Sequence, residues 1–320
     1  MDPGDRLLGD RGAAVRPDLA PARGVKQAIG YYVYRFLAGV LGLLPEPVMR
    51  RLGYAVGWLT SFVARDRFAM AVRHQTRVAG TPVGSRRAAR RVFMWYGRYW
   101  AEVFWMRPRR RRRVLATTEL AGIEILLGAV AAGKGVIVAL PHMGNWEAAG
   151  LRAASEGARV LAVAEELGNE RIVQWFVKLR HMMDIDIVIA RKGSRVTREL
   201  LERLDQGGVV ALVCDRDLSR RGIPVTFFGE ETTLPPGPLS LADRTGATLL
   251  PVGTYFGRGA GHRFVVHPPL EIPPAADAEE RVRLGTQLLA AKFEEVIRAA
   301  PEQWHLILPN WPSDREAAAR

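Results

Sequence analysis

The sequence has a single cysteine, Cys214, among its 320 residues. One thiol can form neither an internal disulfide framework nor a thiolate zinc site, and a reducing cytoplasm fits this composition. The G-x-S-x-G turn of serine hydrolases, a Walker-type phosphate loop and a dinucleotide-binding glycine pattern are also missing. These absences argue against a serine hydrolase, a P-loop nucleotidase and a dehydrogenase.

Long apolar runs are missing as well. Residues 28–44 are apolar but are interrupted by Arg35, whereas a membrane-spanning helix needs about 18 or more uninterrupted apolar residues. Residues 48–64 mix aliphatic and aromatic side chains with Arg50 and Arg51. Two amphipathic helices joined by Pro-Glu-Pro favour an interfacial membrane contact; the alternative is that both pack on the main domain.

Acidic residues are few relative to basic ones. The 33 Asp and Glu stand against 46 Lys and Arg, which gives a net charge of +13. This balance favours an anionic partner: nucleic acid, an anionic membrane surface, or a phosphorylated ligand such as coenzyme A. An aromatic helical pattern over 85–106 is followed by five arginines at 109–113. Because its aromatics repeat on one helical face, we expect docking on anionic lipid rather than nucleic acid, with a solvated charge run as the alternative.

Polar chemistry follows a buried strand in the stretch Gly135 to Gly150, GVIVALPHMGNWEAAG. His142 and Glu147 stand just beyond this strand, where ligands bind in open α/β sheets. A neutral, correctly oriented imidazole can take a proton from a hydroxyl, and a carboxylate that bonds its other nitrogen provides both conditions. The same spacing also arises by chance, so a solvated or capping role stays open.

Short apolar runs and helical patterns alternate through the rest of the chain. This alternation predicts an α/β fold with a mixed central sheet flanked by helices and an N-terminal amphipathic helical segment. The predicted strands are 135–140, 159–164, 185–189, 209–213, 224–228, 248–255 and 264–266, and the predicted helices are 171–182, 195–204, 238–245 and 279–298.

Acids also follow two other predicted strands. Glu165 and Glu166 come after one, and Asp215 and Asp217 after another. A divalent metal held by His142 and such acids is an alternative, but no second His lies close in sequence, so we expect none. Cys214 beside Asp215 is expected to be a small buried hydrophobe rather than a nucleophile.

Four ordered motifs carry a family resemblance. They are LPHMGNWE, CDRDLSRRGIPVTFFGE, LPPGPLSLADRTGATLLPV and PEQWHLILPNW. They resemble the lipid A late acyltransferase branch of the lysophospholipid acyltransferase superfamily, and in particular the phosphatidylinositol mannoside acyltransferases. The latter similarity includes the segment from Asp215 to Leu218 and the Trp304-His305 tail. Two acids depart from the family pattern, because Glu147 stands where Asp is usual and Asp215 where Glu is usual.

The resemblance implies a peripheral membrane enzyme that moves a fatty acyl group from acyl coenzyme A to a glycolipid hydroxyl. His142 is our candidate general base, oriented by Asp215 or Glu147, with Asp215 favoured because the resembling family uses that position. The candidate substrate-binding residues are Asn145, Trp146, Glu165, Arg180, Arg191, Arg216 and Gly237, of which the three arginines would meet anionic groups or, alternatively, form ordinary ion pairs.

These observations predict the domain plan and the function. We expect a disordered leader over 1–25 without the apolar core of a signal peptide, followed by one domain over 26–320, with membrane-docking helices in 26–113 and a catalytic α/β core in 114–320. The expected acceptor is a phosphatidylinositol mannoside; a lipid A precursor, a lysophospholipid, or a nonenzymatic basic lipid- or nucleic-acid-binding role are the alternatives. We expect no cofactor beyond the acyl coenzyme A donor, no nucleic acid, and a peripheral location on the cytoplasmic face of the cell inner membrane or plasma membrane.

Overall fold

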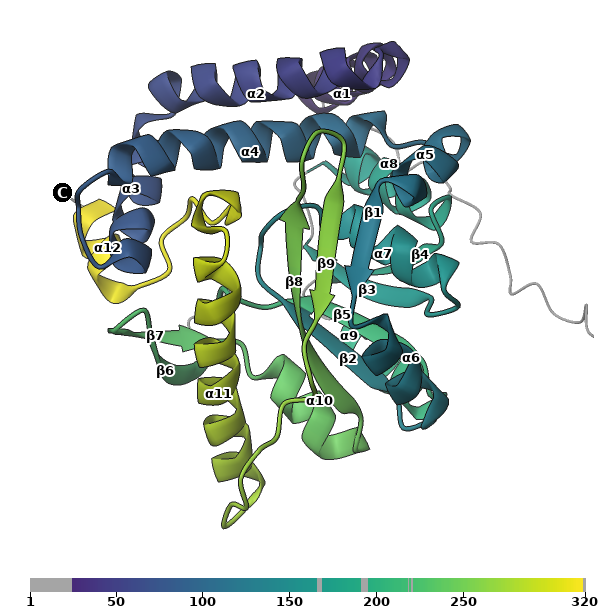
Figure 1. The fold of residues 1–320 in the computed structure, drawn as a ribbon, viewed down its shortest axis with the longest axis vertical. Helices are drawn as coiled ribbons and strands as arrows, with labels where there is room; N and C mark the ends of the chain where they lie inside the picture. The colour runs from purple at the N-terminus through teal and green to yellow at the C-terminus, as the bar shows by residue number, and fades with distance from the viewer. Residues whose placement is uncertain (1–24, 166–168, 191–194, 218, 220, 319–320) are drawn as a thin grey trace, which may run out of the picture.

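The computed structural model describes residues 25–165, 169–190, 195–217, 219 and 221–318 (Figure 1). The predicted leader therefore lies almost wholly outside the described residues, as do Glu166 and Arg191.

A seven-stranded mixed sheet forms the centre of the protein (Figure 1). Its strand order is β1-β9-β8-β2-β5-β3-β4, and neighbouring strands are parallel except for β8 and β9. Their bounds are Thr118–Ala121 (β1), His262–Val266 (β9), Thr248–Phe256 (β8), Val136–Leu140 (β2), Val209–Val213 (β5), Val160–Glu165 (β3) and Ile185–Ala190 (β4). The predicted fold class is confirmed. The predicted strand near 224–228 instead joins a separate hairpin, β6 (Ile223–Phe227) with β7 (Glu230–Leu234).

Both faces of the sheet are covered, which explains why its central strands are apolar at successive positions. In β2, Ile137 and Ala139 face one core, packed by α9 (Val196–Asp205), α10 (Gly237–Thr245) and α11 (Ala278–Arg298). Val136 and Leu140 belong to the opposite core, packed by α6 (Ile123–Ala131) and α7 (Trp146–Ser155). Alternation of side chains along the strand therefore supplies both cores at once. The helix α8 (Glu170–His181) packs beside β4.

The N-terminal helices lie across the end of the sheet at which the parallel strands β2 and β8 finish (Figure 1). They are α1 (Val25–Leu43), α2 (Glu46–Val63), α3 (Arg65–Ala79), α4 (Ser85–Trp105) and the short α5 (Arg111–Ala116). The helices α2 and α4 cross closely through glycines: a Cβ at Gly57 would lie 2.1 Å from the Phe93 carbonyl oxygen, and one at Gly97 would lie 2.2 Å from that of Gly53. Small residues thus allow the two backbones to touch.

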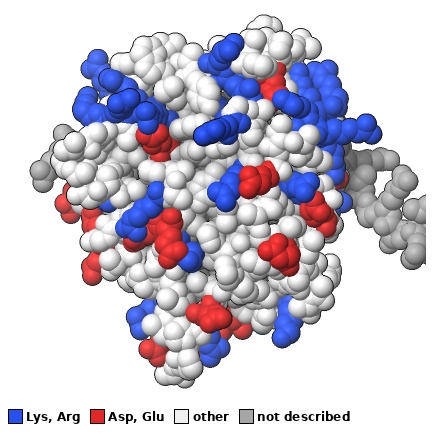
Figure 2. Space-filling model, viewed as in Figure 1, with Lys and Arg blue, Asp and Glu red and all other residues white. Residues whose placement is uncertain are grey.

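Most of the large exposed apolar side chains of the described chain lie on α1 and α2. They are Ile29, Tyr32, Val33, Phe36, Leu37, Val40, Leu43, Val48, Leu52, Val56, Trp58, Leu59, Phe62 and Val63. Figure 2 shows Lys and Arg side chains gathered on either side of this apolar surface, over the start of α4 and over α5. Among the described residues, no helix has both the length and the apolar character that crossing a membrane requires.

The C-terminal residues return to the sheet end beneath α4. A single 3-10 turn at Pro301–Gln303 and the short helix α12 (Pro312–Ala318) enclose the stretch that contains Trp304 and Trp311, both fully buried. This tail reaches the residues that follow β2, so it takes part in the candidate site.

Candidate active site

His142 and Asp215 meet at the carboxyl ends of two neighbouring parallel strands. The register pairs Leu140 of β2 with Val213 of β5, so the residues two positions beyond each strand end stand at the same level. Such a pair of strand ends, with helices returning on both faces, is the usual place for a site in an α/β sheet. The pairing of β2 with β5 therefore brings together side chains that are 73 residues apart in the chain.

Asp215 is fully buried and each of its oxygens is occupied. Its Oδ1 bonds Nδ1 of His142, while Oδ2 accepts hydrogen bonds from the His142 backbone N–H at 3.0 Å and from Nε1 of Trp304 at 2.7 Å. The Asn310 side-chain amide donates to the Asp215 carbonyl oxygen at 3.2 Å. These contacts fix the carboxylate, and through it the plane of the imidazole.

The electrostatics of this pair keep the carboxylate ionised. Burial raises the pKa of Asp215, but the charge of His142 and the hydrogen bonds from His142 and Trp304 outweigh burial and lower that pKa below its ordinary value. The His142 side chain is 27% exposed, and its Nε2 has no hydrogen-bond partner within the described part of the chain. With Nδ1 directed at a carboxylate, Nε2 is the nitrogen that can accept a proton from an approaching molecule.

The loop after β2 is held by the C-terminal tail. Met143 forms a β-bridge with Trp304, the Gly144 N–H donates to the Gln303 carbonyl at 3.1 Å, and the His305 N–H donates to the His142 carbonyl at 2.7 Å. Gly144 has a φ of +57°, and a Cβ there would lie 2.2 Å from the Thr254 carbonyl oxygen. Glycine is required at this position by both conformation and space.

Asn145 links this loop to α4. It caps the N-terminus of α7, where its Oδ1 accepts from the Ala148 N–H at 3.1 Å, and its Nδ2 donates to Glu102 at 2.7 Å. Glu102 also bonds Arg98 at 2.6 Å and Nε2 of His262 at 2.8 Å. Burial raises the pKa of Glu102, yet His262 and Arg98 overcome it and bring that pKa to about 2. A charged network therefore ties the loop after β2 to the helix above it.

Residues 19–313 match the family described as bacterial lipid A biosynthesis acyltransferase. The chain belongs to this family.

Curated relatives extend over most of the chain. The phosphatidylinositol mannoside acyltransferase of Mycobacterium tuberculosis H37Rv is 36% identical over 292 residues, which cover 83% of this chain and 90% of the relative. The protein of the same name from Mycolicibacterium smegmatis is 34% identical over 285 residues, covering 82% and 91%. A lipid A biosynthesis acyltransferase of Haemophilus influenzae is 22% identical over 201 residues, covering 62% and 61%. The resemblance inferred from the four motifs is thus confirmed.

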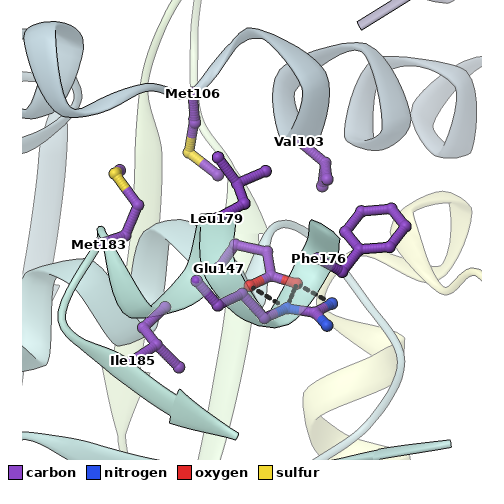
Figure 3. A pocket seen from close by; sticks show the side chains of 8 residues that line it. Val103, Met106, Glu147, Phe176, Leu179, Met183 and Ile185 are labelled. Carbon is purple, nitrogen blue, oxygen red and sulfur yellow. Dashed lines mark hydrogen bonds and ion pairs between the residues drawn. The ribbon is translucent and has the colours of Figure 1, made fainter. Parts of the chain in front are cut away.

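Glu147, the other acid predicted beside the histidine of this acyltransferase, bonds a different group. Arg180 forms an ion pair with Glu147. Its Nε lies 2.9 and 3.0 Å from the two carboxylate oxygens, and its Nη2 lies 2.5 Å from one of them. Figure 3 shows this ion pair among the apolar side chains of a small pocket of about 10 Å³. Among the described residues Glu147 makes no bond to His142, so Asp215 alone of the two acids touches the imidazole. Arg180 is thus paired with Glu147, and a role for it toward an anionic substrate group stays a prediction.

The structure locates the remaining predicted substrate-binding residues of the acyltransferase without fixing a role for most of them. Trp146 begins α7 with its ring centroid 5.9 Å from that of His142, so it borders the site. Glu165 ends β3 and Arg216, half-buried, follows Asp215 directly. Gly237 begins α10, and a Cβ there would enter open space. Roles for Glu165, Arg216 and Gly237 in substrate binding stay predictions.

Cys214 is buried, as expected from its place at the end of an apolar strand. Burial, and then the charge of Asp215, raise the pKa of its thiol well above the ordinary value, so it is not a ready nucleophile. No three metal-ligating side chains converge in the part of the chain that the structure describes.

Sequence reasoning missed several residues that support the acyltransferase site. Glu102 and Arg98 lie buried on α4 within the aromatic stripe. The signal that could have identified them is an acid and a base at i, i+4 spacing on an otherwise aromatic helical face. The tail motif did include Trp304, but only the structure shows that its indole bonds Asp215. Asn310 also lies in this motif, but its contact with the Asp215 backbone carbonyl is shown only by the structure.

Proposed function

We propose that this acyltransferase moves a fatty acyl group from acyl coenzyme A to a hydroxyl of a phosphatidylinositol mannoside at a membrane surface. The observation that carries the chemistry is the contact of His142 Nδ1 with buried, ionised Asp215, which leaves Nε2 as a proton acceptor. Support for the acceptor comes from the relatives named phosphatidylinositol mannoside acyltransferase, which match more than four-fifths of the chain.

In the proposed reaction, His142 Nε2 removes the proton of the acceptor hydroxyl as that oxygen attacks the thioester carbonyl carbon. A carbon–oxygen bond forms, and the carbonyl π electrons move to oxygen. As the tetrahedral intermediate collapses, the carbon–sulfur bond breaks and the coenzyme A thiolate leaves. The proton held on His142 passes to that thiolate or to water, which restores the neutral imidazole. Asp215 stabilises the imidazolium between the two proton transfers.

The negative oxygen of the tetrahedral intermediate needs hydrogen-bond donors. The first turn of α7 begins four residues after His142, and the N–H groups of Trp146 and Glu147 have no partner among the described residues. Free amides at a helix start carry partial positive charge, which suits a developing anion. We therefore assign oxyanion stabilisation to the start of α7, whose direction is fixed by the Asn145 cap.

The exposed apolar surface of α1 and α2 is the proposed membrane contact. A large apolar patch flanked by basic side chains favours insertion to the headgroup level of an anionic bilayer. The protein is then peripheral, on the cytoplasmic face of the membrane where acyl coenzyme A is available. Sedimentation with anionic vesicles that weakens at high salt supports this attachment; equal, salt-independent binding to neutral vesicles would remove its electrostatic part.

The acceptor is tested by acyl transfer from radiolabelled acyl coenzyme A to separate acceptors: mannosylated inositol lipids, lysophospholipids and lipid A precursors. We expect labelled product with the mannosylated lipids and none with His142→Ala. Product only with a lipid A precursor or a lysophospholipid would replace the proposed acceptor, while no product with any of them, by a folded protein, would favour a nonenzymatic lipid-binding role.

A further inference from the structure

A second, larger hollow lies apart from His142, between α2, α4 and the tip of the β8–β9 hairpin. Its volume is about 620 Å³, within the range of small-ligand pockets. Its lining includes Arg50, Arg51, Trp95, Arg98, Phe256 and Arg258. We call it the arginine groove. It lies beyond the proposed acyl-transfer chemistry, because none of its lining side chains bonds His142 or Asp215 within the described residues.

Four arginines and no acid line the arginine groove. Arg98 is neutralised below by Glu102, and Arg50 is paired with Glu46 on its own helix. Arg51 and Arg258 are exposed, and neither forms an ion pair with any described residue. The groove therefore carries two uncompensated guanidinium groups from opposite walls, which is a charge arrangement that attracts a phosphate rather than a neutral ligand.

Stacked aromatic rings form the floor of the groove, and the glycine-rich hairpin tip forms one wall. Trp95 and Phe256 stack with ring centroids 5.2 Å apart, and Arg98 lies over Phe256 at 4.3 Å, so the floor is a packed aromatic surface. The hairpin tip carries glycines on both sides of Arg258, with Gly259 at a φ of +58°. The N–H groups of Arg258 and Gly259 have no acceptor among the described residues, so unpaired backbone donors are available at this tip beside the Arg258 charge.

The position of the groove on α2 points to the source of the phosphate. Arg50, Arg51 and Tyr54 line the groove at helical spacing, while the apolar side chains of Leu52 and Val56 project from the same helix into solvent. Successive residues turn by about 100° around a helix, so the groove opens beside the apolar face rather than opposite it. Figure 2 shows positive side chains over α2 and the hairpin region on this face. If the apolar face enters a bilayer, the groove stands at headgroup level.

We propose that the arginine groove binds the phosphate of an anionic phospholipid headgroup, as a docking site separate from the acyl-transfer site. Neighbouring residues of α4 face the groove and the acyl-transfer site separately. Trp95 and Arg98 face the groove, whereas Tyr99, one residue further on, packs against Trp146 beside His142 with ring centroids 4.3 Å apart. A lipid in the groove would hold the protein at the surface without occupying the site.

The test compares two double variants that remove equal charge. The groove variant, Arg51→Ala with Arg258→Ala, removes both unpaired arginines from the groove. The control variant, Arg87→Ala with Arg112→Ala, removes two exposed arginines elsewhere on the basic surface. Binding is measured to phosphatidylcholine vesicles with and without phosphatidylinositol, and to soluble glycerophosphoinositol and coenzyme A by calorimetry. Neither measurement involves acyl transfer, so failure of the proposed reaction would leave the result interpretable.

We expect the groove variant to lose roughly tenfold or more in affinity for phosphatidylinositol vesicles, because each lost contact is a charge-assisted hydrogen bond. The control variant should lose clearly less, and glycerophosphoinositol should bind the wild type and the control but not the groove variant. Equal loss in both variants would overturn the proposal in favour of general surface attraction. Binding of coenzyme A that depends on Arg51 and Arg258, with vesicle binding unchanged, would also overturn it, by assigning the groove to the donor.

Discussion

The buried histidine of the C-terminal tail should make this protein sensitive to mild acid. His305 is 5% exposed, and its Nε2 lies 3.0 Å from the Gly144 carbonyl oxygen, to which its N–H donates, while Nδ1 has no partner among the described residues. Burial lowers the pKa of His305 from 6.5 to about 3, and the charge of His142 acts in the same direction. The hydrogen bond to Gly144 and the charge of Asp215 oppose this shift without cancelling it.

The sign of the effect follows from where the protons bind. In the unfolded chain His305 has its ordinary pKa, so between pH 6.5 and about 3 the unfolded state holds one proton more than the folded state. The free energy of unfolding therefore decreases as the pH is lowered through this window. Each pH unit in this window costs at most about 1.4 kcal/mol, and acidification from pH 7 to 5 removes about 2 kcal/mol. The lowered pKa values of Asp215 and Glu102 act in more acid solution, because their ordinary values are 3.8 and 4.5.

The comparison variant is His305→Gln, whose side-chain amide can donate to Gly144 and does not titrate. Urea unfolding of both proteins at pH 7, 6 and 5 gives the free energy of unfolding at each pH. We expect the wild type to lose about 2 kcal/mol more than the variant across this range. Parallel losses in the two proteins would refute the assignment of a neutral, buried His305.

Two further substitutions test the loop and the second acid. Gly144→Ala should cost about 2 kcal/mol or more and lower turnover, because its positive φ is unfavourable for Ala and its Cβ would press on the Thr254 carbonyl oxygen; a melting temperature and turnover equal to the wild type would contradict this. Glu147→Gln should destabilise the protein by about 1 to 3 kcal/mol by leaving Arg180 without its counter-charge. Its pH–rate profile should match that of the wild type, and a shifted profile would instead place Glu147 in contact with His142.

The sequence predicted where the strands end, but not which strands lie next to each other in the sheet. Apolar, β-branched runs bounded by glycine and proline predicted β2 and β5, and so placed His142 and Asp215 at carboxyl ends of strands. Their contact depends on β2 lying next to β5, and this order is set by how the intervening helices pack on the two faces of the sheet. Local patterns contain no information about that choice, which is why two acids remained candidates.

The short spacing of His142 and Glu147 gave the misleading signal. A loop of four residues suggested that Glu147 could reach back, but Glu147 lies in the first turn of α7 and its carboxylate is bound by Arg180 of α8. Likewise, the aromatic segment over 85–106 was expected to dock on anionic lipid, but its Phe93, Tyr99 and Phe104 side chains are buried in the core. The charged network inside that face depends on a partner from β9 that lies 160 residues further along the chain.

The central claim is that His142, held by Asp215, is the general base for acyl transfer. The most direct measurement is single-turnover acyl transfer from acyl coenzyme A to a mannosylated inositol lipid by His142→Ala, Asp215→Asn and the double variant, with folding checked by circular dichroism. We predict a loss of about 10² to 10⁴ in rate for His142→Ala, a loss for Asp215→Asn, and a double variant little slower than His142→Ala, because the two groups act as one unit. A wild-type rate in folded His142→Ala, or losses that multiply in the double variant, would contradict the claim.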